Sequence, residues 1–193
     1  MKKVFAVVLA LALVFSMCAC GKASGPEGTM QGFCNAMKAL DLTKMNEFVK
    51  DGATPEELDM SEVPDAFMSI LKGWAKDLKY KINKAETSGN ESKVKVDFTY
   101  TDAAPVVTAA MADYITKALA QALAGNTSED AMTKLLIECI EAAQKTTKTE
   151  TKDISLDFDL EQVDGKWLIK DAPADLATVL LSNFMESLQG LFQ

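Results

Sequence analysis

The chain has 193 residues, of which 48% are hydrophobic and 25% are charged, a composition typical of a folded protein with one globular domain. Its 20 basic residues are all lysines, it contains no histidine, and its 28 acidic residues leave a net charge of −8. The acidic balance disfavours nucleic acid as a partner, and the absence of histidine excludes histidine-dependent catalytic triads and zinc ligation by imidazole.

Residues 1–19 have the pattern of a secretory signal peptide. Lys2 and Lys3 come first and are followed by an apolar run over residues 4–15. That run is shorter than the roughly 20 residues that cross a bilayer, and small residues follow it, as before a cleavage site. We therefore predict that residues 1–19 direct export and are then removed.

The letters MCACG at residues 17–21 resemble the lipobox of bacterial lipoproteins. In that family a signal peptidase cuts before a cysteine that receives a diacylglyceryl group. A leucine-like residue stands three positions before that cysteine, and a small residue stands directly before it. Met17 and Ala19 match these positions around Cys20, whereas the large Met17 directly before Cys18 makes Cys18 the poorer acceptor. The resemblance implies that Cys20 carries the lipid.

A lipidated Cys20 would make the protein a lipoprotein on the extracytoplasmic face of the cell membrane, most simply of a Gram-positive bacterium. Two membrane-bound acyl chains or more give stable anchoring. The alternative interpretations are an ordinary secreted protein and a Cys-x-Cys metal or redox pair. Residues 20–28, rich in Gly, Ser and Pro, are predicted to be a flexible tether, and residues 29–193 a single α+β domain.

The first part of the domain is predicted to be helical. Apolar residues recur at helical spacing over residues 30–37, 42–49 and 63–78. The letters TPEEL at residues 54–58 carry the signals of another helix start, with Thr54 as its N-cap. Each of these helices has one apolar face, so they must pack against another element.

That element is predicted to be an antiparallel sheet of about four strands. The segments KVKVDFTY (residues 93–100) and DISLDFDL (residues 153–160) alternate strictly between apolar and polar residues, as half-buried strands do. The first follows the segment LKYKINKAE through a TSGN turn. The second continues through the tight turn Asp164-Gly165 into KWLIKD. These segments predict two hairpins.

A pair of helices is predicted between the hairpins, over residues 104–147. The first helix carries an apolar stripe that we expect to face the core, made of Val107, Met111, Ile115 and Leu119. Gly125-Asn126 separates it from the second helix. Pro173 is predicted to open one final C-terminal helix with an apolar stripe that continues to Leu188.

The order of helices, hairpin, helices and hairpin, closed by DGKWLI around Trp167, resembles the ketosteroid-isomerase-like or cystatin-like cone fold over residues 29–172. Small uncharacterised lipoproteins of Gram-positive bacteria carry such domains. The resemblance implies a pocket, and in the enzymes of this fold a carboxylate base works with a tyrosine or a protonated acid. Tyr100 is predicted to point inward, but Asp97, Asp157 and Asp159 alternate outward. No catalytic residue can therefore be assigned, and we predict a protein that is not an enzyme.

Three groups of side chains are candidate binding residues. Tyr100, Met111 and Met132 could line a space for a small apolar ligand, although core packing is the simpler interpretation of the methionines. Asp157, Asp159 and Glu161 share one strand face about 6.6 Å apart, which suits either a cation site or a face paired with lysines. The candidate lysines are Lys93, Lys95, Lys166 and Lys170.

Cys34 and Cys139 lie in apolar helical stripes and are predicted to be either buried thiols or a disulfide. The whole pattern favours a membrane-anchored, non-catalytic binding module without a cofactor. Its expected partner, besides the membrane, is an envelope protein or a small apolar ligand. The alternative function is a cone-fold enzyme that acts on a small apolar substrate.

Overall fold

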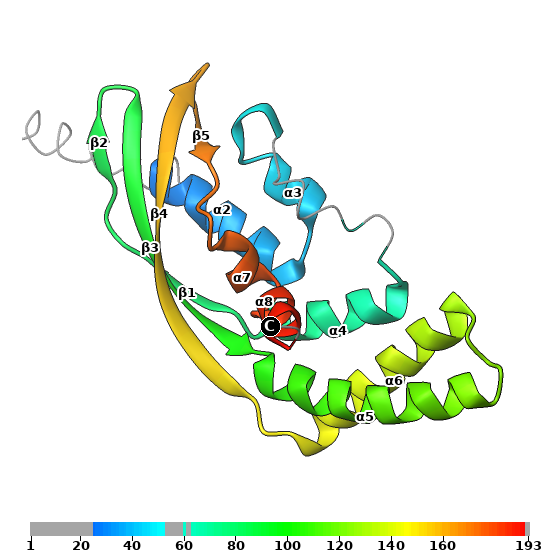
Figure 1. Ribbon diagram of the computed structural model, residues 1–193. Coiled ribbons are helices and arrows are strands. Elements are labelled where there is room, and N and C mark those ends of the chain that lie inside the picture. Colours follow the sequence, from blue (N-terminus) through cyan, green and yellow to red (C-terminus); the bar gives the residue numbers. More distant parts are fainter. Residues whose placement is uncertain (1–24, 53–59, 61–62, 192–193) are drawn as a thin grey trace, which may run out of the picture.

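The protein is an α+β protein built on one antiparallel sheet (Figure 1). A computed structural model describes residues 25–52, 60 and 63–191. The strands pair in the order β1-β3-β4-β5, and β2 pairs with β3 beyond the end of β1. Their bounds are β1 (Lys79–Ile82), β2 (Glu86–Ser88), β3 (Glu91–Asp102), β4 (Glu150–Val163) and β5 (Lys166–Asp171).

The strand expected over LKYKINKAE is divided into β1 and β2. Between them the backbone N–H of Ala85 donates to the carboxylate of Glu27 at 3.0 Å instead of to β3. The other hairpin forms as predicted. Asp164 and Gly165 have φ values of 49° and 79°, the left-handed conformation that a type I′ turn requires at both central residues.

The central pair β3–β4 explains the alternation in the sequence. Its register runs from Glu91 opposite Glu161 to Asp102 opposite Glu150. Val94, Val96 and Phe98 of β3 and Leu156, Phe158 and Leu160 of β4 are buried on one face of the sheet. The charged residues between them lie on the other face, which we call the polar sheet face.

Helices from the N-terminal part cover the buried face. α2 (Pro26–Ala39) places Phe33 against Phe158, edge to face, with ring centroids 5.9 Å apart. α4 (Asp65–Lys76) adds Ile70, Leu71 and Trp74 to the same core. α2 begins at Pro26, a residue preorganised for the first helical position, so residues 26–28 belong to the domain and not to the tether.

Residues 48–52, which follow α2 and α3 (Leu42–Asn46) in the chain, lie beside the edge strand β5. α3 is followed by a short helix, η1 (Lys50–Gly52), and the backbone N–H of Ile169 donates to the carbonyl of Phe48 at 2.8 Å. The helix predicted from Thr54 lies outside the described residues. The stripe that starts at Val63 does form a helix, but its first helical residue is Asp65.

The single C-terminal helix that the sequence suggests is two helices, α7 (Leu176–Leu180) and α8 (Phe184–Gly190). Ser182 and Asn183 between them both have left-handed backbones, with φ values of 55° and 61°. The carbonyl of Ser182 accepts from the backbone N–H of Ala103 at 2.9 Å. The break turns Phe184 into the core, where its ring lies 4.9 Å from that of Phe67.

The predicted helical pair is present as α5 (Ala104–Leu123) and α6 (Glu129–Thr146), a hairpin that extends away from the end of the sheet (Figure 1). Val106, Val107 and Ala110 near the sheet are buried, but Ile115 and Leu119 are 61% and 63% exposed. The expectation that the whole stripe faces the core is therefore wrong for its outer half, which extends past the helices and strands that bury the inner half. None of the helices in the described parts is both long and apolar enough to cross a membrane.

Candidate functional site

The three residues predicted to line a ligand space do not meet at one hollow. Tyr100 is 5% exposed at the end of the buried sheet face, and Met111 packs partly buried near the inner end of α5. Met132 lies in the first turn of α6, at the outer end of the helical hairpin. None of the three lines the hollows described below.

A different hollow, of about 330 Å³, lies between α7 and α8. Its apolar lining includes Ala177, Leu181 and Phe184, and its polar lining includes Thr178, Asn183 and Glu186. The hydroxyl of Thr178 donates to the carboxylate of Glu186 across the two helices. The hollow therefore combines an apolar wall with hydrogen-bonding groups, as sites for small molecules do.

A buried polar cluster adjoins this hollow through Asn183. The side-chain amide of Asn183 donates to Oδ1 of Asp102 at 2.9 Å, and the backbone N–H of Ala104 donates to the same oxygen at 3.1 Å. The other oxygen, Oδ2, lies 2.9 Å from Nζ of Lys152. The cluster thus joins the end of β3, the start of β4, the start of α5 and the turn between α7 and α8.

The protonation states of this cluster follow from its contacts. Burial acts to raise the pKa of Asp102, but the hydrogen bonds from Asn183, Lys152 and Ala104 outweigh it and lower that pKa. The hydrogen bond to Asp102 raises the pKa of Lys152. Burial raises the pKa of Tyr100, which stands directly opposite Lys152 in the β3–β4 register. At neutral pH the cluster is a charged ion pair beside a neutral phenol.

The contacts of Asp102 suit a role in holding Asn183 in place better than a role in proton transfer. A general base needs a free oxygen and a pKa near the working pH. Both oxygens of Asp102 are engaged, and its pKa is lowered. The cluster instead fixes Asn183, a lining residue of the α7–α8 hollow.

Sequence reasoning missed Asp102 and Lys152, although the signal was present. Asp102 is two residues beyond Tyr100, and Lys152 is two residues before Ile154, so both fall on the buried face by simple alternation. The expectation that no carboxylate shares a face with Tyr100 is wrong, because Asp102 does. It is tolerated there because its charge is paired.

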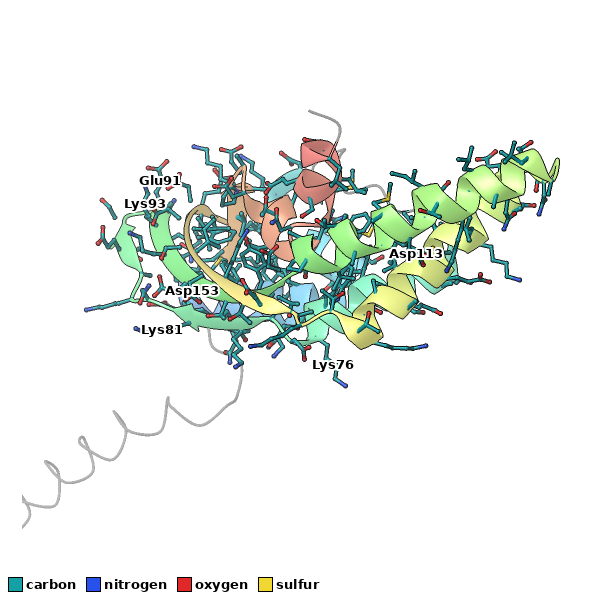
Figure 2. The ribbon with its side chains drawn as sticks, turned by 60° about the horizontal axis from the view of Figure 1, so that its bottom comes forward. Lys76, Lys81, Glu91, Lys93, Asp113 and Asp153 are labelled. Carbon is teal, nitrogen blue, oxygen red and sulfur yellow. The ribbon has the colours of Figure 1, made fainter. Side chains whose placement is uncertain are left out.

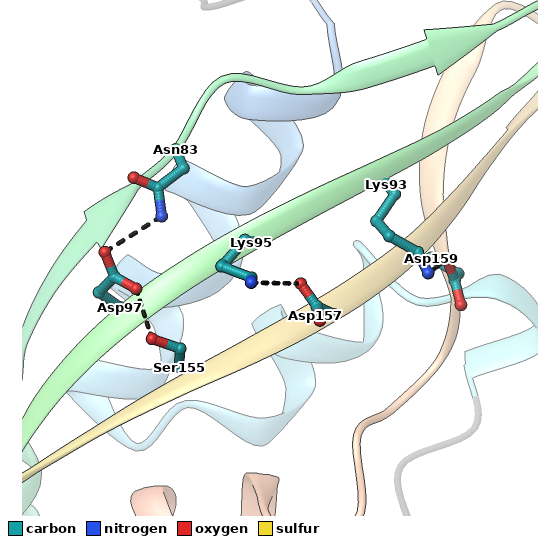
Figure 3. Close-up of polar contacts among 7 residues, drawn as sticks. All are labelled: Asn83, Lys93, Lys95, Asp97, Ser155, Asp157 and Asp159. Carbon is teal, nitrogen blue, oxygen red and sulfur yellow. Dashed lines mark hydrogen bonds and ion pairs between the residues drawn. The ribbon is translucent and has the colours of Figure 1, made fainter.

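The row Asp157, Asp159 and Glu161 lies against lysines. Figure 3 shows Lys93 directed at Asp159 and Lys95 at Asp157, at 3.6 and 3.8 Å. Glu161 is 2.6 Å from Lys50 of η1, a partner that the sequence did not suggest. Lys93 and Lys95 are thus confirmed as neighbours, while Lys166 and Lys170 have no ion pair with a described residue. Within the described ranges, no group of three or more acidic or cysteine side chains could hold a metal ion.

The rest of the polar sheet face is also cross-linked by side chains. Asp97 accepts from the hydroxyl of Ser155 at 2.6 Å and from the amide of Asn83 at 3.1 Å (Figure 3). These bonds lower the pKa of Asp97. A shallow hollow of about 300 Å³ on this face has polar and charged walls that include Glu86, Glu91 and Lys170.

The remaining predicted residues are placed as follows. Cys34 in α2 and Cys139 in α6 are both buried free thiols. Burial raises the pKa of Cys34 to about 12. Cys20 lies outside the described residues. No family model, no curated protein and no solved structure matches the chain.

Proposed function

We propose that the protein is a lipoprotein anchored through Cys20 to the extracytoplasmic face of the cell membrane, with a cone-like α+β domain that serves as a non-catalytic binding module. The observation that carries the anchor is the sequence around Cys20. Two lysines, a short apolar run and the residues Met17 and Ala19 stand in the order of a lipoprotein signal. Here the proposal rests on the sequence alone.

The short distance between Cys20 and the domain gives the anchor a geometric consequence. Residues 21–25 separate Cys20 from Pro26, the first residue of α2. At no more than about 3.5 Å per residue, the Cα atoms of Cys20 and Pro26 are within roughly 21 Å of each other. The start of α2 lies at the end of the sheet opposite the α5–α6 hairpin (Figure 1). The hairpin would therefore point away from the lipid.

The hollow between α7 and α8 is the proposed binding site of the module. Its apolar wall suits a small apolar ligand, or one apolar side chain of an envelope protein. The carboxylate of Glu186 and the amides of Asn183 and Gln189 could then accept or donate one or two hydrogen bonds. The Asp102–Lys152 ion pair supports this site by holding Asn183 in place.

A cone-fold enzyme acting on a small apolar substrate is the second candidate. The observation in its favour is that Tyr100 and Asp102 share one face at the end of β3. Against it stand the paired oxygens of Asp102. In the enzyme, Asp102→Asn would abolish turnover of a bound substrate, whereas in a binding module it would leave ligand affinity within a few fold.

The anchor is tested by expressing the full chain in a Gram-positive host and separating membranes from soluble protein. We expect the wild type in the membrane fraction and Cys20→Ala in the soluble fraction or as an uncut precursor. Cys18→Ala is the matched control and should stay in the membrane. An inhibitor of lipoprotein signal peptidase should leave a heavier precursor. Membrane retention of Cys20→Ala at wild-type mass would refute the anchor.

The binding site is tested by the thermal unfolding of the full chain with lipids, sterols and cell-wall fragments. A ligand that binds the hollow of the folded protein raises the unfolding temperature, and the rise grows with the ligand concentration relative to its Kd. Ala177→Phe fills the hollow and should abolish the rise, while Ala142→Phe, at an exposed position of α6, should keep it. A rise that survives Ala177→Phe would mean that the ligand binds elsewhere.

A further inference from the structure

Exposed apolar side chains are concentrated on two helices that contact each other. Six large hydrophobic side chains are exposed in the described part of the chain. Four of them belong to α5 and α8, and a fifth, Leu191, directly follows α8. Ile115, Leu119 and Leu123 form a row along the outer half of α5, with Leu123 84% exposed. Exposed apolar patches of this kind mark interaction sites in soluble domains.

The row lies beside a groove of small side chains with the same spacing. Ala112, Thr116 and Ala120 are all exposed and repeat every four residues, and Thr116 and Ala120 directly follow Ile115 and Leu119 of the large row. We call the large row the α5 ridge and the small row the α5 groove. When ridges spaced by four residues interdigitate, two helices cross at about −50°. A surface that holds both features is complementary to a second copy of itself around a two-fold axis.

The charges on α5 restrict the chemistry of the partner. Asp113 and Lys117 are the charged residues of this helix, and they are bonded to each other at 2.7 Å. Asp113 lies on the side of α5 that faces α6 (Figure 2). The ridge and groove are therefore uncharged, although the chain has a net charge of −8. A basic partner would find no counter-charge here, whereas two acidic copies can meet at this face without opposing like charges.

We infer that the α5 ridge and groove form an isologous interface with α5 of a second copy of this chain. The ridge of each copy lies in the groove of the other. The ridge spans only residues 115–123, about 12 Å of helix, so the interface falls below the standard size of about 800 Å² per partner. The dimer is consequently weak and depends on protein concentration.

This interface is separate from the proposed binding module. It uses α5, whereas the ligand hollow lies between α7 and α8, and it requires neither the lipid on Cys20 nor a bound ligand. The direction of the hairpin, which extends away from the start of α2, leaves its outer half accessible to a second copy (Figures 1 and 2).

The test is sedimentation of the purified full chain in detergent, from low micromolar to near-millimolar concentration. The wild type should shift from the monomer mass to twice that mass as its concentration rises. Leu119→Glu should remain a monomer throughout, because it buries a charge in the groove of the partner. Val163→Glu changes another exposed apolar side chain, at the end of β4, and should dimerise like the wild type.

Cross-linking in cells gives an independent measurement. In Thr116→Cys, near the centre of the ridge and groove, a short bismaleimide should join two copies, and the added change Leu119→Glu should remove the product. Ser155→Cys on the polar sheet face is the matched control and should give no dimer. A wild type that stays monomeric at every concentration, a Leu119→Glu variant that still dimerises, or cross-linking of Thr116→Cys only to a different protein would overturn the inference.

Discussion

Nζ of Lys152 lies 2.9 Å from Oδ2 of Asp102, and this ion pair connects the start of β4 with the end of β3. The side chain of Asp102 is 7% exposed and that of Lys152 is 50% exposed, so the pair stands at the edge of the core. Because Asp102 also accepts from Asn183, the pair holds the turn between α7 and α8 against the end of the sheet. One buried carboxylate therefore ties the turn between α7 and α8 to the end of the sheet, beside the apolar contacts of Phe184.

Removing Asp102 should destabilise the fold more than removing Lys152. Lys152→Met leaves the carboxylate with two other donors and solvent at one side, so we expect a loss of about 1–2 kcal/mol. Asp102→Ala leaves the buried amide of Asn183 without its hydrogen-bond acceptor and should lower the free energy of unfolding by about 2–4 kcal/mol. Urea unfolding at pH 7 measures both losses. Lys93→Met, from an exposed pair on the polar sheet face, is the control and should change little; an equal loss there would contradict the argument.

The contribution of this pair should depend on pH at both extremes. The pKa of Asp102 is lowered from 3.8, so its stabilisation is present above pH 3.8 and is lost as the pH falls through the lower folded value. The pKa of Lys152 is raised from 10.5, so its stabilisation is present below pH 10.5 and is lost as the pH rises through the higher folded value. The difference in unfolding free energy between the wild type and Lys152→Met should thus be constant between these limits and shrink beyond them. A difference that varies around pH 7 would assign the effect to another group.

Cys34 should be unreactive while the protein is folded. Its side chain is 0% exposed, and burial raises its pKa to about 12, so little thiolate forms and reagents cannot reach it. Alkylation at pH 8 followed by peptide mass mapping should find Cys34 unmodified in the native protein and modified in urea. Because the folded pKa lies above the ordinary value of 9.0, stability should also fall as the pH rises above 9.0. Rapid native alkylation of Cys34 would mean that α2 opens locally.

Two helical glycines should respond to alanine in opposite directions. A Cβ at Gly32 would lie 2.3 Å from the ring of Phe48, whereas nothing lies within 4 Å of a Cβ at Gly73. Gly73→Ala should stabilise α4 by about 0.5–1 kcal/mol through helix propensity alone. Gly32→Ala gains the same stabilisation from helix propensity but displaces the ring of Phe48. We therefore expect the free energy of unfolding to fall by about 1 kcal/mol.

Thermal unfolding of both variants measures the contrast between these glycines. A shorter side chain in Phe48→Leu should remove the clash, so adding Gly32→Ala to that variant should stabilise it. If Gly32→Ala destabilised the Phe48→Leu protein as much as the wild type, the ring would not be the cause.

The sheet was predictable because its alternation is a local property. The period of two places Val94, Val96 and Phe98 on the same face of a strand, and that face must be the buried one. Asp164-Gly165 supplies the tight turn into the next strand. The break at Asn183 was not predictable from local pattern, since apolar residues continue on both sides of it. At the break, Asn183 bonds to Asp102, 81 residues away in the chain, and Ser182 accepts from Ala103.

The remaining differences have the same origin. The stripe on α5 keeps its helical period past the point where the neighbouring elements end, so the period alone cannot tell a buried residue such as Val107 from an exposed one such as Leu119. Lys152 was missed because the strand was predicted to begin at Asp153, whereas β4 begins at Glu150, and because its counter-charge comes from another strand. Tertiary partners, not local propensity, decide these positions.

The helical hairpin also has a consequence for the order of folding. Residues 103–149 separate the two central strands, and closing so long a loop opposes their pairing. α5 leads the chain about 30 Å outward and α6 returns it by about 27 Å, so a formed hairpin brings Asp102 and Glu150 together beforehand. We expect α5–α6 to form before β3 and β4 pair, and Ala122→Gly in α5 to slow refolding more than it speeds unfolding in stopped-flow experiments. The early formation of the α5–α6 hairpin would then lower the entropy cost of pairing β3 with β4.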